Sequence, residues 1–162
     1  MKKDRNDKLA EMADFLFKDY LANDEPFGVL TRPALEVVMS SCTGLNRIYV
    51  VDFQDIHKMN IMVGYVEVNN IIRESIADFT YNYKGVVVGR VFSGDEIAII
   101  DDREYAGLME GFAEICKPRN LGFRWIDSTI TLGKSKRYYR KQLDDLSEKL
   151  RLSRYAKMLW IR

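Results

Sequence analysis

The chain of 162 residues is long enough for one domain with a substantial core. Its 25 Lys and Arg against 24 Asp and Glu give a net charge of +1, which provides no global attraction for duplex DNA. No stretch approaches the ~18 apolar residues of a membrane span, and Cys42 and Cys116 lack the spacing of a zinc site. We therefore expect a cytoplasmic protein with two free thiols and no membrane partner.

The N-terminal region predicts two helices followed by a strand. Residues ~5–22 form the first, amphipathic helix, because apolar side chains recur at helical spacing at Leu9, Met12, Leu16 and Tyr20. The turn-forming stretch ANDEPFG reads as a linker, and RPALEVVMSSC predicts a second helix with Pro33 in its first turn. RIYVVDF predicts a buried strand that ends on an acid. Residues 1–25 are thus expected to precede one domain over residues 26–162.

The remainder of the chain alternates helices with strands. Helices are expected from Met59 to about Phe79, where Gly64 separates a short helix from a longer one. GVVVGRVF and EIAIID flank a Ser-Gly-Asp turn and predict an antiparallel hairpin. REYAGLMEGFAEICK predicts a helix, FRWIDSTITLG a strand, and residues ~138–158 a final helix. This order predicts an α+β or mixed α/β fold in which helices cover a sheet.

Two acids stand at the ends of predicted strands. Asp52 ends the first strand, and Asp95 lies at the tip of the hairpin. If the strand lies beside the hairpin, both carboxylates project at one edge of the sheet and repel each other unless a divalent cation neutralises them. Taken singly, each acid is more typical of turn or helix-cap chemistry. The interpretation therefore depends on the wider pattern.

That wider pattern resembles the GGDEF family, the nucleotidyl cyclases that make cyclic dinucleotides. In that family a D-x-D-x-F-K-x-x-N-D-x-x-G-H-x-x-G-D run precedes the GGDEF hairpin. This chain matches the run at Asp52, Asn60, Gly64 and Asn69, within VVDFQDIHKMNIMVGYVEVNNII. It matches the hairpin at the SGDEI turn of GRVFSGDEIAII. FGVLTRPAL is similar to the family's D-x-L-T-G-L-x-N-R opening, and SRYAKMLW to its A-L-Y-x-A-K helix. The resemblance covers residues ~26–160. It implies a palm-like α+β fold, with a central mixed, mainly antiparallel sheet that carries the active-site acids on a hairpin and is covered by helices.

The resemblance also implies roles for the acids. Asp52, the Phe53 carbonyl and Asp95 would hold Mg²⁺ or Mn²⁺, and Glu96 would assist deprotonation of an attacking 3′-hydroxyl. Gly94 would leave the backbone bare so that a nucleotide can approach closely. Two such ions about 4 Å apart activate an attacking hydroxyl and stabilise a leaving phosphate.

The resemblance also implies phosphate contacts. Lys157 matches a family lysine that reaches the triphosphate, and His57 stands at the usual lysine position after the first strand. A solvated lysine on a terminal helix and an exposed loop histidine are the alternatives. The chain departs from the family where Gln54 replaces the second acid of DxD and Ile161 replaces an arginine. The RxxD product-inhibition motif is absent from NYKGVVVGR.

The base-reading positions differ from the family in a way that bears on the substrate. The family reads guanine with an Asn and an Asp, whereas this chain has Asn60 and Asn69. A side-chain amide offers one donor and one acceptor, which matches the N6 donor and N1 acceptor of adenine. We therefore expect ATP to be favoured over GTP. The alternative is that Asn69 only caps or solvates a helix and another group reads the base.

These observations lead to three functional hypotheses. The first is a metal-dependent nucleotidyltransferase that condenses two NTPs, ATP or GTP, into a cyclic dinucleotide and releases pyrophosphate. Each palm binds one nucleotide, so a homodimer is expected, with the N-terminal helix as a candidate contact. The short chain is also similar to the minimal CRISPR polymerases, which are associated with antiviral nucleotide signalling. The others are a degenerate palm that binds a nucleotide and signals through a protein partner, and a purely structural domain.

Overall fold

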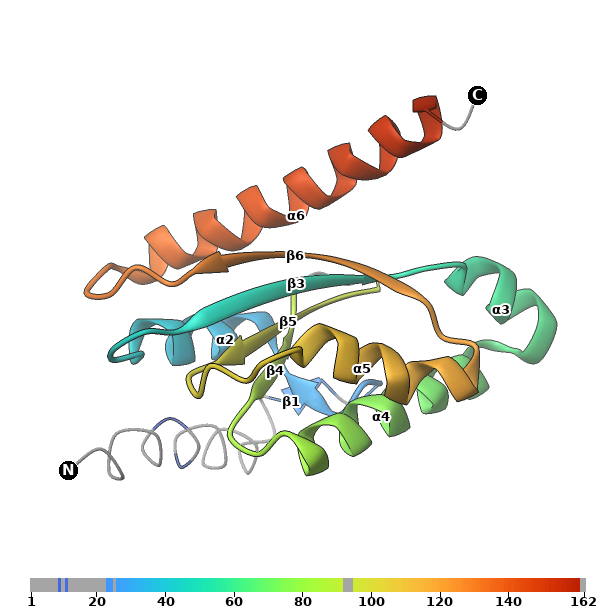
Figure 1. Cartoon of the computed structure of the whole chain (residues 1–162), viewed down its shortest axis with the longest axis horizontal. Coiled ribbons are helices and arrows are strands. Elements are labelled where there is room, and N and C mark those ends of the chain that lie inside the picture. Colours follow the sequence, from blue (N-terminus) through green and yellow to red (C-terminus); the bar gives the residue numbers. More distant parts are fainter. Residues whose placement is uncertain (1–8, 10, 12–22, 25, 92–94, 161–162) are drawn as a thin grey trace.

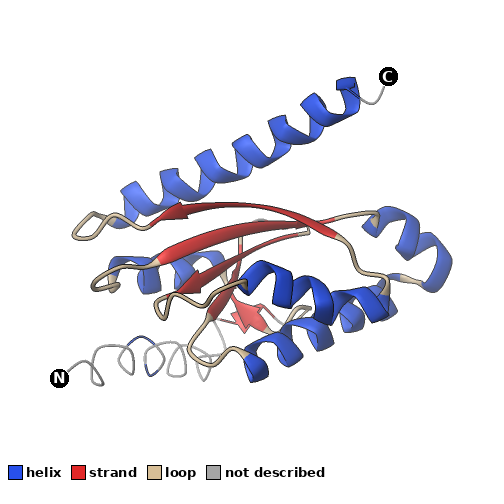
Figure 2. Cartoon of the chain, viewed as in Figure 1, coloured by secondary structure: helices blue, strands red, loops and turns tan. Residues whose placement is uncertain are grey.

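The computed structural model describes residues 9, 11, 23–24, 26–91 and 95–160, and for residues 23 and 154–160 it describes the backbone alone. Its strands are β1 (Asn23–Asp24), β2 (Val29–Leu30), β3 (Arg47–Phe53), β4 (Val87–Arg90), β5 (Glu96–Asp101) and β6 (Phe123–Thr129). Its helices are α2 (Arg32–Ser40), α3 (Ile56–Val63), α4 (Tyr65–Asn82), α5 (Leu108–Cys116), the short η2 (Lys117–Arg119) and α6 (Lys136–Trp160) (Figures 1 and 2).

The described strands form one mixed sheet in the order β1-β2-β4-β5-β3-β6. β2 and β4 pair in parallel, and each of the other neighbouring pairs is antiparallel. Helices cover the sheet on both sides (Figure 1). The expected fold class, a mainly antiparallel mixed sheet covered by helices, is therefore confirmed.

Most predicted elements appear close to their expected positions. RIYVVDF forms β3 over the same residues, and the hairpin pairs β4 with β5. Gly64 separates α3 from α4 with a backbone φ of 90°, a conformation that glycine adopts readily. The expected linker differs, because β1 pairs with β2 and joins the sheet. Two-residue strands are too short to produce a periodic signal in the sequence.

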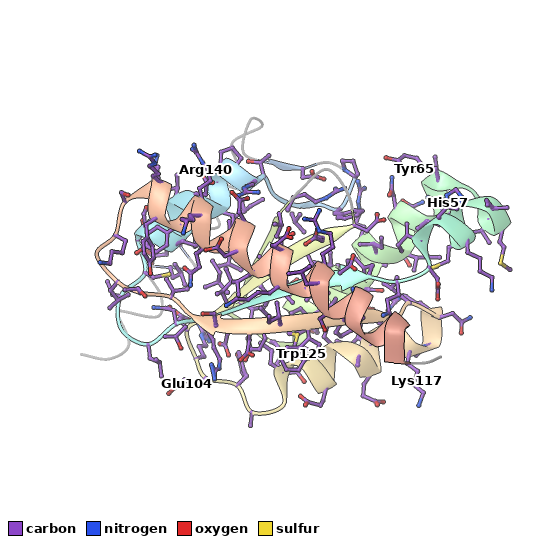
Figure 3. The ribbon with its side chains drawn as sticks, turned by 90° about the horizontal axis from the view of Figure 1, so that it is seen from above. His57, Tyr65, Glu104, Lys117, Trp125 and Arg140 are labelled. Atoms are coloured by element: carbon purple, nitrogen blue, oxygen red, sulfur yellow. The ribbon has the colours of Figure 1, made fainter. Side chains whose placement is uncertain are left out.

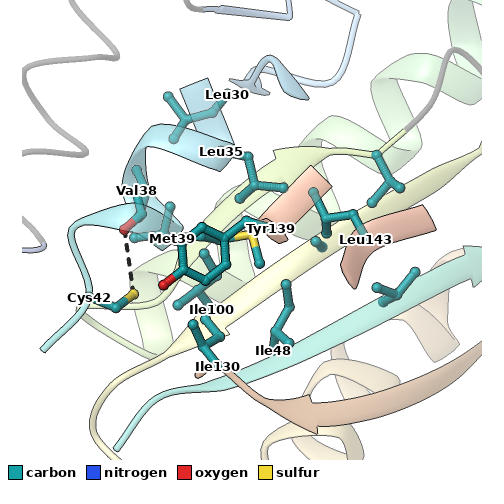
Figure 4. Close-up of a cluster of buried hydrophobic side chains, with 14 of the residues drawn as sticks. Leu30, Leu35, Val38, Met39, Cys42, Ile48, Ile100, Ile130, Tyr139 and Leu143 are labelled. Atoms are coloured by element: carbon teal, nitrogen blue, oxygen red, sulfur yellow. Dashed lines mark hydrogen bonds between the residues drawn. The ribbon is translucent and has the colours of Figure 1, made fainter. Parts of the chain in front are cut away.

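The core lies in two layers because alternate residues of a strand face opposite sides of the sheet. On one side, Ile48 and Val50 of β3 pack in the cluster that includes residues of α2 and α6 (Figure 4). On the other side, Tyr49, Val51 and Phe53 pack in the cluster that includes residues of α4 and α5. β3 is therefore covered on both faces, and its charged residues, Arg47 and Asp52, lie towards its two ends.

The N-terminal helix is described only in part. Leu9 and Glu11 are helical, and Leu9 is buried in the cluster with α2 and α6; the other residues of the expected helix lie outside the described part of the chain. Cys42 and Cys116 are free and buried, and burial raises the pKa of each thiol to about 12. Among the described residues, no helix combines the length and the apolar character that crossing a bilayer takes.

Candidate active site

Two of the predicted acids face each other across neighbouring strands. Asp52 of β3 and Glu96 of β5 are Cα partners in the antiparallel register. Residues directly opposed in such a pair project on the same face of the sheet. Here that face is covered by α6, and the two acids line a small cavity of about 120 Å³ together with Ser147, Leu150 and Arg151.

A cation from the next strand compensates Asp52. Arg124 of β6 is the other register partner of Asp52, and its Nη2 donates to Asp52 Oδ2 at 3.2 Å. The Arg124 and Asp52 side chains are only 13% and 21% exposed, so water screens this ion pair weakly. Nη1 of Arg124 is buried and has no hydrogen-bond partner within the described part of the chain.

Glu96 is held by a hydroxyl from the covering helix. Ser147 Oγ donates to Glu96 Oε1 at 2.7 Å. Burial raises the pKa of the Glu96 carboxyl; the Ser147 hydrogen bond opposes that rise, and the negative charge of Asp52 adds to it. A carboxylate with a raised pKa is a better proton acceptor near neutral pH than an ordinary one.

Asp95 is fixed to the end of β3 through the backbone. The Phe53 N–H donates to the Asp95 carbonyl oxygen at 3.0 Å, which brings the hairpin turn against the end of the strand. Burial raises the pKa of the Asp95 carboxyl, Arg90 lowers it, and Asp52 raises it. The structure therefore brings Asp52, Asp95 and Glu96 close enough for their charges to interact. Glu96, rather than Asp95, lines the cavity with Asp52.

Two arginines anchor the base of the hairpin. Arg90 pairs with Asp24 at 3.0 Å and lies over the Phe27 ring, 3.7 Å from its centroid. Arg32 Nη1 donates to the Val91 carbonyl at 3.1 Å, while Nη2 reaches α6. The chain segment leading into the turn is thus held from both sides of the sheet. Residues 92–94, which include Gly94, lie outside the described part of the chain.

The predicted base-reading residues lie on the pair of helices that follows β3. Asn60 is on α3 and Asn69 is on α4, and both are partly buried. The Asn60 Oδ1 atom is buried and has no hydrogen-bond partner in the described part of the structure. His57 is exposed on α3, at the end of the molecule where α3 and α4 meet (Figure 3). An unpartnered amide oxygen is a feature that a ligand with an amino group would satisfy.

The predicted phosphate residue on α6 lies further from the acids. Lys157 comes six residues after Arg151, which corresponds to about 9 Å along a helix axis. Its backbone is helical, and its side chain lies outside the described residues. Arg151 is therefore the basic residue of α6 that lines the cavity of the two acids.

Comparison with known proteins gives matches among solved structures. No family model and no curated protein matches the chain. A microbial GGDEF domain studied with bis-(3′,5′)-cyclic di-GMP is 14% identical at a TM-score of 0.67, covering 83% of this chain and 95% of that chain. The GGDEF domain of DgcB from Caulobacter crescentus, in complex with c-di-GMP, is 15% identical at a TM-score of 0.56, covering 87% of this chain and 89% of that chain.

A third structure is the diguanylate cyclase SiaD from Pseudomonas aeruginosa, solved in complex with its activator SiaC. It is 12% identical at a TM-score of 0.61, and the match covers 93% of this chain and 66% of SiaD. The chain has the fold of a GGDEF domain. At these identities the likeness concerns the fold, so the chemistry of this GGDEF-fold domain must be argued from its own residues.

The donor atoms of this GGDEF-fold domain fit a metal that arrives together with phosphates. Mg²⁺ is usually held by one or two carboxylates plus substrate phosphate oxygens. Within the described residues, no group of three or more His, Cys, Asp or Glu side chains is arranged to hold a metal ion on its own. Arg124 occupies Oδ2 of Asp52, which leaves Oδ1 as a possible ligand. The acids therefore suit a nucleotide-bound ion better than a resident one.

Three polar residues of the site were missed by the sequence analysis. Arg124 reaches Asp52 through the β3–β6 register, and Ser147 and Arg151 reach the acids through the packing of α6. Arg124 lies 72 residues from Asp52, and Ser147 lies 51 residues from Glu96. No local pattern in a single sequence marks contacts of that range.

A larger cavity, of about 550 Å³, lies on the opposite face of the sheet, where α5 and η2 meet the end of β6; Lys117 and Trp125 of its lining are labelled in Figure 3. It is lined by Gln54, Met109, Glu110, Ala113, Glu114, Lys117, Asn120, Leu121, Gly122, Phe123 and Trp125. Asp52 and Glu96 are not among these residues. The candidate active site is therefore defined by its charges and not by its volume.

Proposed function

We propose that this GGDEF-fold domain is a metal-dependent nucleotidyltransferase that condenses two NTPs into a cyclic dinucleotide and releases pyrophosphate. The observation that carries the proposal is the pairing of Asp52 with Glu96 across adjacent strands, at the end of an otherwise apolar sheet face. Two partly buried carboxylates side by side repel each other, and Arg124 pairs with Asp52 alone, so a further cation would stabilise the pair. Solved structures of the same fold include a diguanylate cyclase and domains bound to cyclic di-GMP, which supports the same reaction class.

In the proposed reaction Glu96 acts as the proton acceptor. Its carboxylate accepts the proton of the attacking ribose hydroxyl as that oxygen bonds to the α-phosphorus of the second nucleotide. The bond from this phosphorus to the bridging oxygen breaks, and pyrophosphate leaves with the electron pair. The raised pKa of Glu96 suits a group that must accept a proton near neutral pH. A second, equivalent transfer closes the ring.

The remaining residues position the phosphates. Asp52, the Phe53 carbonyl and Asp95 would hold Mg²⁺ or Mn²⁺, which supplies charge neutralisation at the transferred phosphoryl group. The guanidinium of Arg151, which also pairs with Glu148, lines the cavity of the two acids and would contact phosphate oxygens. His57 and Lys157 remain candidate phosphate contacts from the resemblance, and Gly94 a candidate point of close backbone approach.

We further propose that the base site favours adenine. The Asn69 amide offers one donor and one acceptor, which complement N1 and N6 of adenine, whereas the Asn60 oxygen, unpartnered among the described residues, could accept from the exocyclic amino group of either base. Asn69→Asp replaces the donor of the second amide with an acceptor, and is therefore expected to shift the NTP preference towards GTP by about tenfold or more. Initial rates with ATP and with GTP measure this ratio. An unchanged ratio would assign base recognition to other residues.

The test of the reaction is mass spectrometry of products after incubation of the full chain with Mg²⁺ or Mn²⁺ and ATP, GTP or both. A cyclic dinucleotide is expected from the wild-type chain and not from Asp95→Ala, provided that thermal unfolding shows the variant to be folded. Omission of the divalent ion should abolish the product. Equal product from both proteins would reject the assignment of Asp95.

One observation favours a second function, that of a nucleotide receptor without turnover. Asp52 is already paired with Arg124, and Glu96 already accepts a hydrogen bond from Ser147. A site whose acids are satisfied within the chain has less need of a metal. This alternative predicts that nucleotide binds, by isothermal titration calorimetry, without any metal-dependent product.

A further inference from the structure

β6 is the outermost strand on its side of the sheet, and its outer edge is open (Figure 1). Within the described part of the chain it pairs with β3 alone, and the register is continuous over all seven residues. The strand contains no proline, no lysine and no bulge, which are the features that usually protect an edge. The strand at the other edge, β1, has only two residues. β6 is therefore the long, unprotected edge of this sheet.

The polar groups of β6 are engaged on its inner side. The two charged side chains, Arg124 and Asp127, form ion pairs with Asp52 and Arg47 of β3. The Thr129 carbonyl accepts a hydrogen bond from the Gln142 side chain of α6 at 3.1 Å. Residues 123–128 thus present unpaired backbone N–H and C=O groups at the outer edge, ready for a chain in an extended conformation.

The larger cavity described above lies directly beside this edge. Phe123 and Trp125 line it from β6, on the same face of the sheet as their register partners Phe53 and Val51, and α5 forms the other wall. Trp125 is 42% exposed despite its size. The cavity volume of about 550 Å³ is within the range of about 300–1,000 Å³ that is usual for binding pockets. An open strand edge and an aromatic wall therefore adjoin one cavity.

The α5 wall of the cavity carries two carboxylates. Glu110 and Glu114 lie one turn apart on the same side of the helix, and both are exposed. Neither forms a hydrogen bond or an ion pair with another described residue. Lys117, at the η2 end, is the basic residue among the described lining, so the lining as a whole is negative. Charge complementarity thus favours an occupant with a cation opposite α5.

The cavity reaches the end of β3 without including the acids. Gln54 lines it, and the Gln54 N–H donates to the Gly122 carbonyl at 2.8 Å, just before β6 begins. Asp52 and Glu96 line the separate, smaller cavity on the α6 face. A chain bound along β6 would therefore leave the candidate active site open.

We propose that β6 and the cavity beside it form a docking site for an extended segment of a partner protein, which adds a strand to the sheet along residues 123–128. Main-chain hydrogen bonds hold the segment, and every second side chain faces α5. One of these side chains is apolar and packs against Trp125 and Met109; the next one, two residues away, is a Lys or Arg that pairs with Glu110 or Glu114. The inference is independent of the proposed reaction.

A second copy of the chain is a poorer occupant of this edge. If two β6 strands paired about a two-fold axis, the side chains that face α5 of one copy would be those on the same face of the other copy's β6. They are Phe123, Trp125 and Asp127, and none of them is basic. Glu110 and Glu114 would then meet an acid and two bulky rings instead of a cation.

The experiment is selection of peptides from a phage-displayed library of random dodecapeptides on the immobilised full chain, followed by fluorescence polarisation of the enriched peptides. Ala113→Arg fills the cavity from the exposed side of α5, and Glu110→Lys and Glu114→Lys reverse the charge of that wall. Glu67→Lys is the matched control, because it makes the same change of charge at an exposed position of α4 outside the cavity. The urea midpoint of each variant shows whether it is folded.

Enriched peptides are expected to carry a Lys or Arg two residues from a large apolar residue. Ala113→Arg should raise their Kd by about thirtyfold or more, and Glu110→Lys and Glu114→Lys by about tenfold each, whereas Glu67→Lys should leave it within about twofold. A bound peptide should slow amide hydrogen exchange at residues 123–128. N-methylation of alternate peptide residues should abolish binding in one register and not in the other, because successive N–H groups of a strand point to opposite sides.

Three results would each overturn the proposal. They are the lack of any peptide whose binding is weakened by Ala113→Arg, equal effects of Glu110→Lys and Glu67→Lys, and unchanged hydrogen exchange at residues 123–128. Sedimentation equilibrium of the wild type and of Ala113→Arg tests the remaining occupant. A dimer that is lost in the variant would assign the edge to a second copy instead of a partner protein.

Discussion

The two faces of the sheet are built on the same strands in the same register, yet they carry different side chains at the end of β3: apolar on one face and charged on the other. On the face covered by α4 and α5, Val51 pairs with Ile97 and the side chains stay apolar. On the face covered by α6, the next pair is Asp52 with Glu96, and Arg124 completes the row. The apolar face demonstrates that the fold itself has no need of charge at this end of the strands. The acids on the other face are therefore better explained by function than by folding.

The cavities on the two faces strengthen this comparison. The apolar face has the larger cavity, about 550 Å³, whereas the two acids line one of about 120 Å³. Only the smaller cavity contains acids on paired strands, with a basic side chain of the covering helix beside them. Converging charged groups are thus a better guide than volume to chemistry in this molecule.

The largest expected effect is on the α6 face. Glu96→Gln keeps the shape of the side chain and removes its ability to accept a proton, so product formation should fall by about 10²–10⁴-fold. Mass spectrometry of the cyclic dinucleotide measures the loss. The variant should remain folded by circular dichroism, because glutamine can still accept the Ser147 hydrogen bond. Undiminished turnover would show that another group takes the proton.

On the face covered by α4 and α5, a substitution should lower the stability of the fold instead of the rate of product formation. Phe112 is fully buried, and its ring centroid lies 4.5 Å from that of Phe79 and 4.9 Å from that of Phe123. Phe112→Ala should lower the free energy of unfolding by about 3–5 kcal/mol, measured by urea denaturation. Glu114→Ala, at an exposed position of the same helix, is the control and should change it by less than about 0.5 kcal/mol. A small loss at Phe112 would contradict a structural role for this face.

Arg124→Gln tests the compensation of Asp52. It leaves a largely buried carboxylate without its cation, which should lower the free energy of unfolding by about 1–3 kcal/mol. Mg²⁺ should recover more stability in this variant than in the wild type, because it can replace the missing positive charge. Arg47→Gln is the matched control on the same strand pair; its ion pair with Asp127 is much more exposed and should contribute less than about 1 kcal/mol. Equal losses of unfolding free energy in the two variants would mean that burial does not strengthen the ion pair of Arg124 with Asp52.

Ser147→Ala should have the smallest effect. It removes the hydroxyl that donates to Glu96, and a net loss of about 1 kcal/mol in the free energy of unfolding is expected. Ser153→Ala, at an exposed position of α6, should be neutral or slightly stabilising because alanine favours the helix. If the two variants have the same stability in urea denaturation, the Ser147 hydrogen bond contributes nothing measurable.

Much of the fold was predictable because it depends on local patterns. The apolar run RIYVVDF predicted β3 over the same residues that form it, and the Ser-Gly-Asp turn between two β-rich runs predicted the β4–β5 hairpin. The two-residue strands β1 and β2 were missed, since their pairing is decided by Arg90 reaching Asp24 and by the backbone of β4. The start of α5 was also expected earlier than Gly107, whose φ of 63° precedes the first helical turn.

For the site, the sequence by itself determined which residues could do chemistry: an acid at the end of one strand, two acids at a turn, and two asparagines on the helices between them. It did so because residue type and short-range spacing are local properties of the chain. Only the tertiary structure decided that Glu96 shares a cavity with Asp52, that Arg124 neutralises Asp52, and that Ser147 and Arg151 close the site. Those contacts join residues more than 40 positions apart, and they arise from the register of the strands and the packing of α6, which no local pattern encodes.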